Sequence, residues 1–173
     1  MFTYCLFCET ASCATVAKIA EIILPCRAIR PRQIQHRLRK SQADDIMRDL
    51  LPGYIFLYFE EDPYPSVTRM RGIPGVLRMM GDAKGRYVLT GKDEEFAMSI
   101  LRCGGVIGKL SVYEEGNMLH LDKSDLDILD VAIRKVDRRK HRMQVQLNFA
   151  NTPTTTWVEY VVRENIPDSN AVY

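Results

Sequence analysis

Six consecutive apolar or aromatic residues, Tyr54 to Phe59, predict a strand near the middle of the chain. Because no polar residue interrupts this run, both faces of the strand should be covered, as in a central strand of a sheet. A turn at Pro52-Gly53 precedes the strand, and acidic residues 60–62 end it. A short helix is predicted from Pro65 to Arg71, since proline suits the first helical position. A second sharp turn follows at Ile73-Pro74-Gly75-Val76.

The N-terminal third predicts a strand, a helix and a basic strand. The first strand is Phe2 to Glu9, and the helix is Ala14 to Leu24, which Pro25 ends. Arg27 to His36 is expected to form the basic strand, and the polar segment from Arg37 to Asp49 a hairpin tip. The helix carries one apolar stripe, which consists of Val16, Ile19, Ala20 and Ile23.

A second helix is predicted after a short segment from Arg86 to Leu89. Thr90-Gly91-Lys92-Asp93 resembles a capping box, so the helix should begin there and run to about Arg102. Gly104-Gly105 should stop it. Its expected buried residues are Phe96, Ala97, Ile100 and Leu101. The element order is then β-α-β-β-α-β-α, which predicts a single antiparallel sheet covered by helices.

The pattern changes beyond residue 105. Frequent glycines predict a linker from Val106 to Asn117. Strands are predicted at Met118 to Leu121, Leu129 to Val136 and Thr155 to Val162. Between Met143 and Phe149, apolar and polar residues alternate as in a half-buried strand. Several short strands predict a small β-barrel, so the expected fold class is α+β: an antiparallel sheet with helices, then a barrel.

Length and composition fit a folded protein in the cytoplasm. The 173 residues allow one ordinary domain or two small ones, and 46% of them are hydrophobic. No apolar run approaches the ~20 residues that span a membrane. The N-terminus lacks a charged segment before an apolar run, so we expect no signal peptide. The five cysteines are expected to be reduced and mostly buried.

Positive charge is concentrated in two stretches, although the net charge is only +2. No acidic residue occurs from Ile22 to Ala43, and these residues include six of the 24 Lys and Arg residues; six more lie between Arg134 and Arg142. A phosphate backbone would relieve the mutual repulsion of such side chains. Alternatively, both stretches are solvated, the second partly neutralised by Asp130 and Asp137. The candidate nucleic-acid-binding residues are Arg30, Arg32, Arg37, Arg39, Lys40, Arg134, Lys135, Arg138, Arg139, Lys140, His141 and Arg142.

No aromatic residue is interleaved with either basic stretch, so base readout of a single strand is not indicated. No constellation of catalytic residues is evident, and the P-loop, G-x-S-x-G and H-E-x-x-H motifs are missing. Cys5-x-x-Cys8 matches a redox or metal motif, but strand positions three apart point to opposite faces. His36, His120 and His141 are far apart in sequence. We expect no cofactor and no metal; a cysteine nucleophile paired with histidine is the enzymatic alternative.

The two Pro-Gly motifs carry a resemblance to a known family. The sequence L-P-G-Y-I-F at 51–56, then I-P-G-V at 73–76 and G-D at 81–82, resembles the N-terminal (NGN) domain of NusG-type transcription elongation factors. Leu51 stands where that family usually has phenylalanine. The resemblance implies a non-catalytic factor that docks on the clamp helices of the largest RNA polymerase subunit. The residues implied for docking are Leu51, Pro52, Gly53, Tyr54, Ile73, Pro74, Gly75 and Val76.

The second part is similar to the KOW module of the same family. The segment from Lys135 to Met143, KVDRRKHRM, is most similar to specialised antiterminators of the LoaP type. The family's usual Gly-Pro is replaced by Ser124-Asp125-Leu126, and its N-terminal Trp-Tyr by Thr3-Tyr4, which favours an operon-specific paralogue. The implied division is an NGN-like domain at 1–105, a linker at 106–117, a KOW-like barrel at 118–166 and a tail at 167–173.

The resemblance also implies partners besides the polymerase. These are RNA and non-template DNA, and a ribosomal protein or termination factor bound through the KOW-like part. The alternative interpretation is an RNA- or ribosome-binding module with no connection to transcription, because KOW-type barrels also occur in ribosomal proteins.

Overall fold

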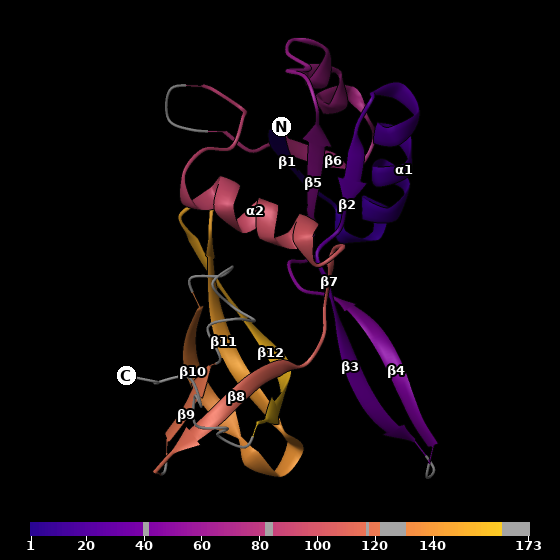
Figure 1. Ribbon diagram of the computed structural model, residues 1–173. Helices are drawn as coiled ribbons and strands as arrows, with labels where there is room; N and C mark the ends of the chain where they lie inside the picture. The colour runs from indigo at the N-terminus through magenta and orange to yellow at the C-terminus, as the bar shows by residue number, and fades with distance from the viewer. Residues whose placement is uncertain (40–41, 82–84, 117, 122–130, 164–173) are drawn as a thin grey trace.

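The computed structural model describes residues 1–39, 42–81, 85–116, 118–121 and 131–163, with side chains left out of the description at 36–44 and 131. The fold is α+β, as expected (Figure 1). The described strands form three sheets, which have four, three and five strands. None of the described helices is long and apolar enough to cross a membrane.

The first sheet has the strand order β2-β5-β1-β6, with all neighbours antiparallel. These strands are Arg27–Ile29, Tyr54–Phe59, Phe2–Cys8 and Val76–Met79. Strand β5 lies between β2 and β1, and all its residues from Ile55 to Phe59 are at most 4% exposed. The prediction of a central strand with both faces covered is therefore confirmed.

The two faces of this sheet belong to different hydrophobic clusters. Ile55, Leu57 and Phe59 pack with Val16 and Ala20 of helix α1 (Cys13–Ile23). Phe56 and Tyr58 face the other way, toward helix α2 (Lys92–Arg102). The predicted stripe of α1 is buried at Val16 and Ala20, whereas Ile23 near the helix end is 42% exposed.

The predicted basic strand is divided in two by Pro31. Its first half is β2, and its second half is β3 (Arg32–Arg39), which pairs with β4 (Gln42–Asp49) and β7 (Val106–Ile107) in the three-stranded sheet. Proline has no N–H to donate, but its carbonyl accepts a hydrogen bond from Leu50 N at 2.9 Å. The expected hairpin is present, but most of the segment from Arg37 to Asp49 is paired strand and not tip, because β3 and β4 stay paired as far as Arg39 and Gln42.

The short helix predicted from Pro65 to Arg71 is present as the 3₁₀ helix η2 (Ser66–Gly72), with Pro65 at its N-cap position. A further 3₁₀ helix, η1, is formed by Thr10–Ser12. The capping box predicted from Thr90 was wrong. Helix α2 begins one residue later than that box requires, and Gly91 occupies the N-cap position without a side chain that could accept a hydrogen bond.

The five-stranded sheet, called the second sheet from here on, has the order β10-β11-β12-β8-β9. Its strands β12 and β8 pair in parallel. The strands are β10 Val131–Asp137, β11 Arg142–Phe149, β12 Thr152–Val162, β8 Leu110–Glu115 and β9 Met118–Leu121, with the 3₁₀ helix η3 at Arg138–Lys140. The predicted alternation of β11 is confirmed, since Met143, Val145, Leu147 and Phe149 are buried. Segment 106–117, expected to lack regular structure, contains β7 and β8.

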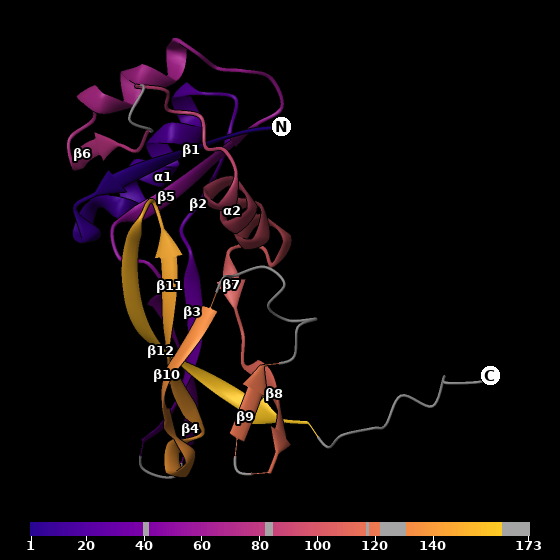
Figure 2. The ribbon, with the colours of Figure 1, turned by 90° about the vertical axis from the view of Figure 1, so that its left-hand side faces the viewer.

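The core of the second sheet is continuous with that of the first. The ring of Phe149, at the end of β11, lies 5.4 Å from that of Tyr54, 5.1 Å from that of Phe56 and 5.3 Å from that of Phe96. Asp93 of α2 accepts a hydrogen bond from Ala150 N at 2.8 Å. Figures 1 and 2 show the turn between β11 and β12 reaching α2 and β5. The two sheets therefore pack as one body.

Candidate functional site

The two Pro-Gly motifs form turns of the same type. Tyr54 N donates to Leu51 O at 3.2 Å, and Val76 N donates to Ile73 O at 3.0 Å. The glycines have φ values of 89° at Gly53 and 90° at Gly75. Proline at the second position and glycine with positive φ at the third are the features of a type II turn. Both turns are therefore rigid for the same local reason.

The two turns meet at the end of strand β1. Cys8 N donates to Gly53 O at 2.7 Å, and the next amide, Glu9 N, donates to Gly75 O at 2.8 Å. Successive backbone amides thus hold turns that are more than twenty residues apart in sequence. We call the residues of both turns, 51–54 and 73–76, the two-turn surface.

Each glycine of the two-turn surface is also enclosed by neighbouring atoms. A Cβ atom on Gly53 would lie 2.8 Å from Cys8 O, and one on Gly75 would lie 2.4 Å from the Cβ of Ser12. Real Cβ atoms do not approach that closely. Both positions therefore require glycine for its φ angle and for its lack of a side chain.

The residues implied for docking differ widely in exposure. Pro52 and Pro74 are exposed, whereas Leu51 is buried in the core that the two sheets share. Tyr54, Ile73 and the two residues after Pro74 are half-buried. The structure brings all eight residues into one region, but Leu51 supports the surface from within instead of lining it.

Tyr54 lies in a stack of aromatic side chains. Its ring is 5.0 Å from that of Phe7, and the guanidinium of Arg78 lies 5.4 Å from the Phe7 ring centre. On another side, the ring of Phe149 packs edge-on against Tyr54. Burial raises the pKa of the Tyr54 hydroxyl, while Arg78 lowers it in part. Sequence analysis missed Phe7, Arg78 and Phe149, because each lies on a different strand and none belongs to the Pro-Gly motifs.

The basic residues near position 140 lie on a compact turn, residues 137–142, which we call the basic turn. Asp137 accepts hydrogen bonds from Lys140 N at 3.2 Å and from Arg142 Nε at 3.1 Å. Desolvation would raise the pKa of Asp137, but these two hydrogen bonds and the positive charges of Arg142 and Lys140 together hold the pKa below its ordinary value. His141 has a left-handed conformation, with φ 46°. Asp137 thus holds the turn together, and Arg139, Lys140 and His141 stay exposed.

The structure does not gather all the predicted basic residues. Arg30 forms an ion pair with Asp49 at 2.8 Å, and Arg134 donates to the side chain of Gln146 on the neighbouring strand. Lys40 and the side chains of Arg37 and Arg39 lie outside the described part of the structure. Arg32 is on strand β3, far from the basic turn in sequence, whereas Lys135 is on β10, two residues before the turn begins.

Aromatic residues do accompany the basic turn, contrary to the expectation from sequence. The guanidinium carbon of Arg142 lies 4.5 Å from the centre of the Trp157 ring, and the rings of His141 and Tyr160 are 6.0 Å apart. Both aromatic residues belong to β12, which pairs with β11 beside the turn. Only the strand pairing reveals this arrangement, because Trp157 is distant from the basic turn along the chain.

The cysteines show no grouping typical of a metal site. Among the described residues, no three His, Cys, Asp or Glu side chains are placed to hold a metal ion. Cys5 and Cys8 belong to different clusters on opposite faces of the first sheet, as predicted from their spacing. Burial raises the pKa of Cys8 to about 12 and that of Cys26 to about 11.

These thiols should react slowly with a thiol reagent at neutral pH, because only the thiolate is nucleophilic. We expect the exposed Cys103 to be labelled first, the half-buried Cys26 more slowly, and Cys5, Cys8 and Cys13 only as the protein unfolds. Mass spectrometry of peptides after timed labelling measures this order. Rapid labelling of a buried cysteine would instead favour the enzymatic alternative.

The raised pKa of Cys8 also predicts how stability depends on pH. Between pH 9, near the ordinary pKa of a cysteine, and about pH 12, the folded state retains a proton on Cys8 that the unfolded state loses. The free energy of unfolding should therefore fall as pH rises through that range.

The comparisons with known proteins decide the fold. No family model matches the sequence, and no curated protein matches it. Among solved structures, one that describes domain interaction in NusG of Thermotoga maritima matches with a TM-score of 0.59. The match covers 91% of this chain and 93% of that one, at 16% sequence identity. This protein has a NusG-like fold. This agrees with the NusG-like resemblance of the Pro-Gly motifs, and the similarity extends over most of the chain.

Proposed function

We propose that this protein is a non-catalytic transcription factor of the NusG type that binds RNA polymerase through the two-turn surface. The observation that carries the proposal is the pair of hydrogen bonds from Cys8 N and Glu9 N, which hold both Pro-Gly turns at one end of β1. A rigid surface with exposed prolines and a half-buried tyrosine suits docking on helices, for which we propose the clamp helices of the largest polymerase subunit.

The packing of Phe149 has a consequence for this proposal. Its ring covers one side of Tyr54 and belongs to the same core cluster as Leu51. A partner that uses the whole face of Tyr54 must therefore displace the second sheet. We propose a first domain at 1–105 that docks and a second at 118–166 that moves away from it, together with β8, which pairs with β12 and β9.

The second domain is proposed to contact nucleic acid through the basic turn. Arg139, Lys140 and His141 are exposed there, and phosphates would neutralise their charge. RNA and non-template DNA are the proposed nucleic acids, and a ribosomal protein or termination factor is a further partner for this domain. The similarity of KVDRRKHRM to LoaP-type proteins supports an operon-specific antiterminator that acts in the cytoplasm.

Replacing Tyr54 with alanine tests the proposed docking. Aromatic anchors at interfaces contribute roughly 2 kcal/mol or more, so we expect Tyr54→Ala to weaken polymerase affinity by about 30-fold. The measurement is the dissociation constant for purified core RNA polymerase, from titration of a labelled protein. Tyr113→Ala is the matched control, because Tyr113 is a half-buried tyrosine of β8 that stacks on His120, outside the two-turn surface. Equal affinity of Tyr54→Ala and the control would refute the docking proposal.

An RNA- or ribosome-binding module without a role in transcription is the second candidate. It is favoured by one observation: the basic turn is exposed, whereas Tyr54 is partly covered by Phe149. RNA affinity without measurable polymerase affinity, both in the whole chain and after the two sheets are separated by mutation, would select this candidate.

A further inference from the structure

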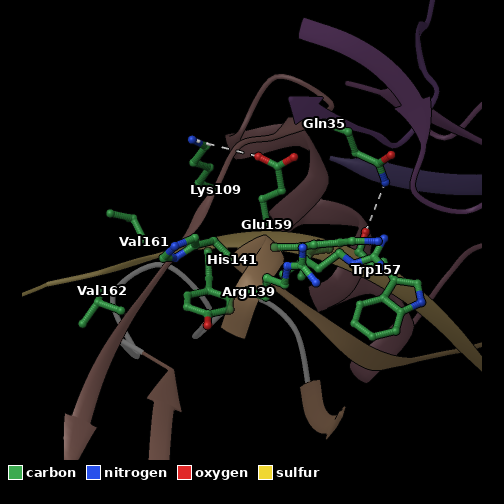
Figure 3. A pocket seen from close by; sticks show the side chains of 12 residues that line it. Gln35, Lys109, Arg139, His141, Trp157, Glu159, Val161 and Val162 are labelled. Atoms are coloured by element: carbon green, nitrogen blue, oxygen red, sulfur yellow. Dashed lines mark hydrogen bonds and ion pairs between the residues drawn. The ribbon is translucent and has the colours of Figure 1, made fainter. Parts of the chain in front are cut away.

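A pocket of about 960 Å³ lies beside the basic turn (Figure 3). Its size is at the upper end of the roughly 300–1,000 Å³ range of ligand sites. Most of its lining comes from the basic turn and strand β12. Two further lining residues are Gln35 of β3 and Lys109, which precedes β8. Gln35 Nε2 donates to Trp157 O at 3.3 Å, so β3 closes one side of the pocket.

The pocket offers a planar stacking surface that is held in place before any ligand arrives. The guanidinium of Arg142 lies over the ring of Trp157 at 4.5 Å. Arg142 is fixed by its ion pair with Asp137, and its side chain is still 37% exposed. Trp157 is half-buried and belongs to a strand paired on both sides. Bases stack on tryptophan rings and on arginine guanidinium planes, and every base has such a face.

The charge around this surface is predominantly positive. Lys109, Arg139, Lys140 and Arg142 line the pocket with His141, and Glu159 is the one acidic residue in the lining. The carboxylate of Glu159 lies 4.0 Å from Lys109 Nζ, so these two charges offset each other. Within the described part of the chain, Arg139 makes no ion pair. The cations of the basic turn thus lie next to the stacking surface, at a position suited to a phosphate.

We propose that this pocket binds one nucleotide of a single-stranded nucleic acid, with its base against the Arg142–Trp157 pair and its phosphate at Arg139 and Lys140. The inference rests on the proposed contact of the basic turn with nucleic acid. It goes further by assigning the strandedness of the ligand and the residue that stacks on its base. A duplex keeps its bases inside and offers only its backbone to such a site.

Trp157 makes the test direct, because it is the only tryptophan in the chain. The intact protein is titrated with a short oligouridine, with oligothymidine and with a duplex RNA of equal length, and tryptophan fluorescence is recorded. We expect the single strands to quench the fluorescence and the duplex to leave it unchanged. A stronger response to oligouridine than to oligothymidine assigns the site to RNA, and the reverse order assigns it to DNA.

Variants are compared by the anisotropy of a labelled oligouridine. We expect Trp157→Ala to weaken binding about 5- to 150-fold, and Trp157→Phe, which keeps a stacking ring, to retain most of the affinity. Arg139→Ala changes an exposed side chain and should lower the slope of log affinity against log salt by about 0.7. Arg69→Ala, which removes an exposed arginine of η2 outside the pocket, is the charge control and should change neither quantity.

The proposal is overturned if Trp157→Ala binds as the wild type does, or if duplex and single strand bind equally without quenching. The second result would leave a backbone contact at the basic turn intact. Failure of every nucleic acid to bind would remove both this inference and the nucleic-acid role of the second domain. The polymerase titration with Tyr54→Ala is independent of these results.

Discussion

Replacing Phe149 with alanine is expected to lower the free energy of unfolding by about 3–5 kcal/mol, the range measured when a buried phenylalanine is removed. Phe149 is 2% exposed, and its ring contacts aromatic rings of the first sheet and of helix α2. Truncation would leave a cavity at the junction of the two sheets. Urea unfolding, followed by circular dichroism, measures the change.

A double-mutant cycle of Tyr54 and Phe149 measures how much of the lost free energy of unfolding comes from the contact between these two rings. The edge-on pair of Tyr54 and Phe149 should give a coupling of roughly 0.5–1.5 kcal/mol between Tyr54→Ala and Phe149→Ala. The wild type should unfold in a single transition, because the two sheets share a core. Two separate transitions in the wild type, or a loss below about 1 kcal/mol in Phe149→Ala, would contradict the shared core.

The same substitution has the opposite expected effect on polymerase binding. Under the proposed function, Phe149 must leave Tyr54 before a partner can use that ring. Phe149→Ala should therefore bind polymerase more tightly than the wild type, although it is less stable. Asp93→Ala removes the acceptor of the Ala150 N hydrogen bond and should act in the same direction with a smaller effect, since a hydrogen bond to a charged carboxylate contributes about 1.5–3 kcal/mol.

Replacing Gly75 with alanine is the second substitution with a large expected effect, about 2–6 kcal/mol of lost stability. Two costs combine. The φ angle of 90° strains any residue with a side chain, at about 1–3 kcal/mol. The added Cβ would also lie 2.4 Å from the Cβ of Ser12, and overpacking of this kind costs about 1–3 kcal/mol. Thermal unfolding measured in parallel with urea unfolding gives the total.

Two other glycines separate these costs. Gly85 has a φ of 77°, and no atom of the described residues lies within 4 Å of an added Cβ, so Gly85→Ala is expected to report the backbone cost alone. Gly108 has open space and no positive φ, so Gly108→Ala should leave stability nearly unchanged. If Gly75→Ala cost no more than Gly85→Ala, the close packing of the turn against Ser12 would be disproved.

Some features of the fold could be predicted because their signal is local. The uninterrupted apolar residues of β5 indicate a strand covered on both faces, and the alternation in β11 indicates a strand with one buried face. Pro-Gly at 52–53 and at 74–75 predicts a tight turn from the backbone preferences of the two residues alone. These predictions depend on neighbouring residues only, and the structure agrees with them.

Other predictions failed where the choice of strand partner decided the outcome. The sequence predicted one basic strand from Arg27 to His36, but in the structure Pro31 separates two strands that belong to different sheets. The glycine-rich segment after residue 105 contains β8, because residues of this segment form hydrogen bonds with the edge of strand β12. Hydrogen bonding to a distant strand gives these residues regular structure that their own composition does not favour.

For this protein, the amino-acid sequence by itself determined strands β5 and β11, the two rigid turns and the resemblance to the NusG-like fold, since each depends on residues close together in the chain. Only the tertiary structure decided that two successive backbone amides at the end of β1 hydrogen-bond to both turns. It also decided that Phe149 covers Tyr54 and that Trp157 lies against Arg142. The physical reason is that these contacts join residues on separate strands, and the pairing and packing of strands are properties of the whole folded chain.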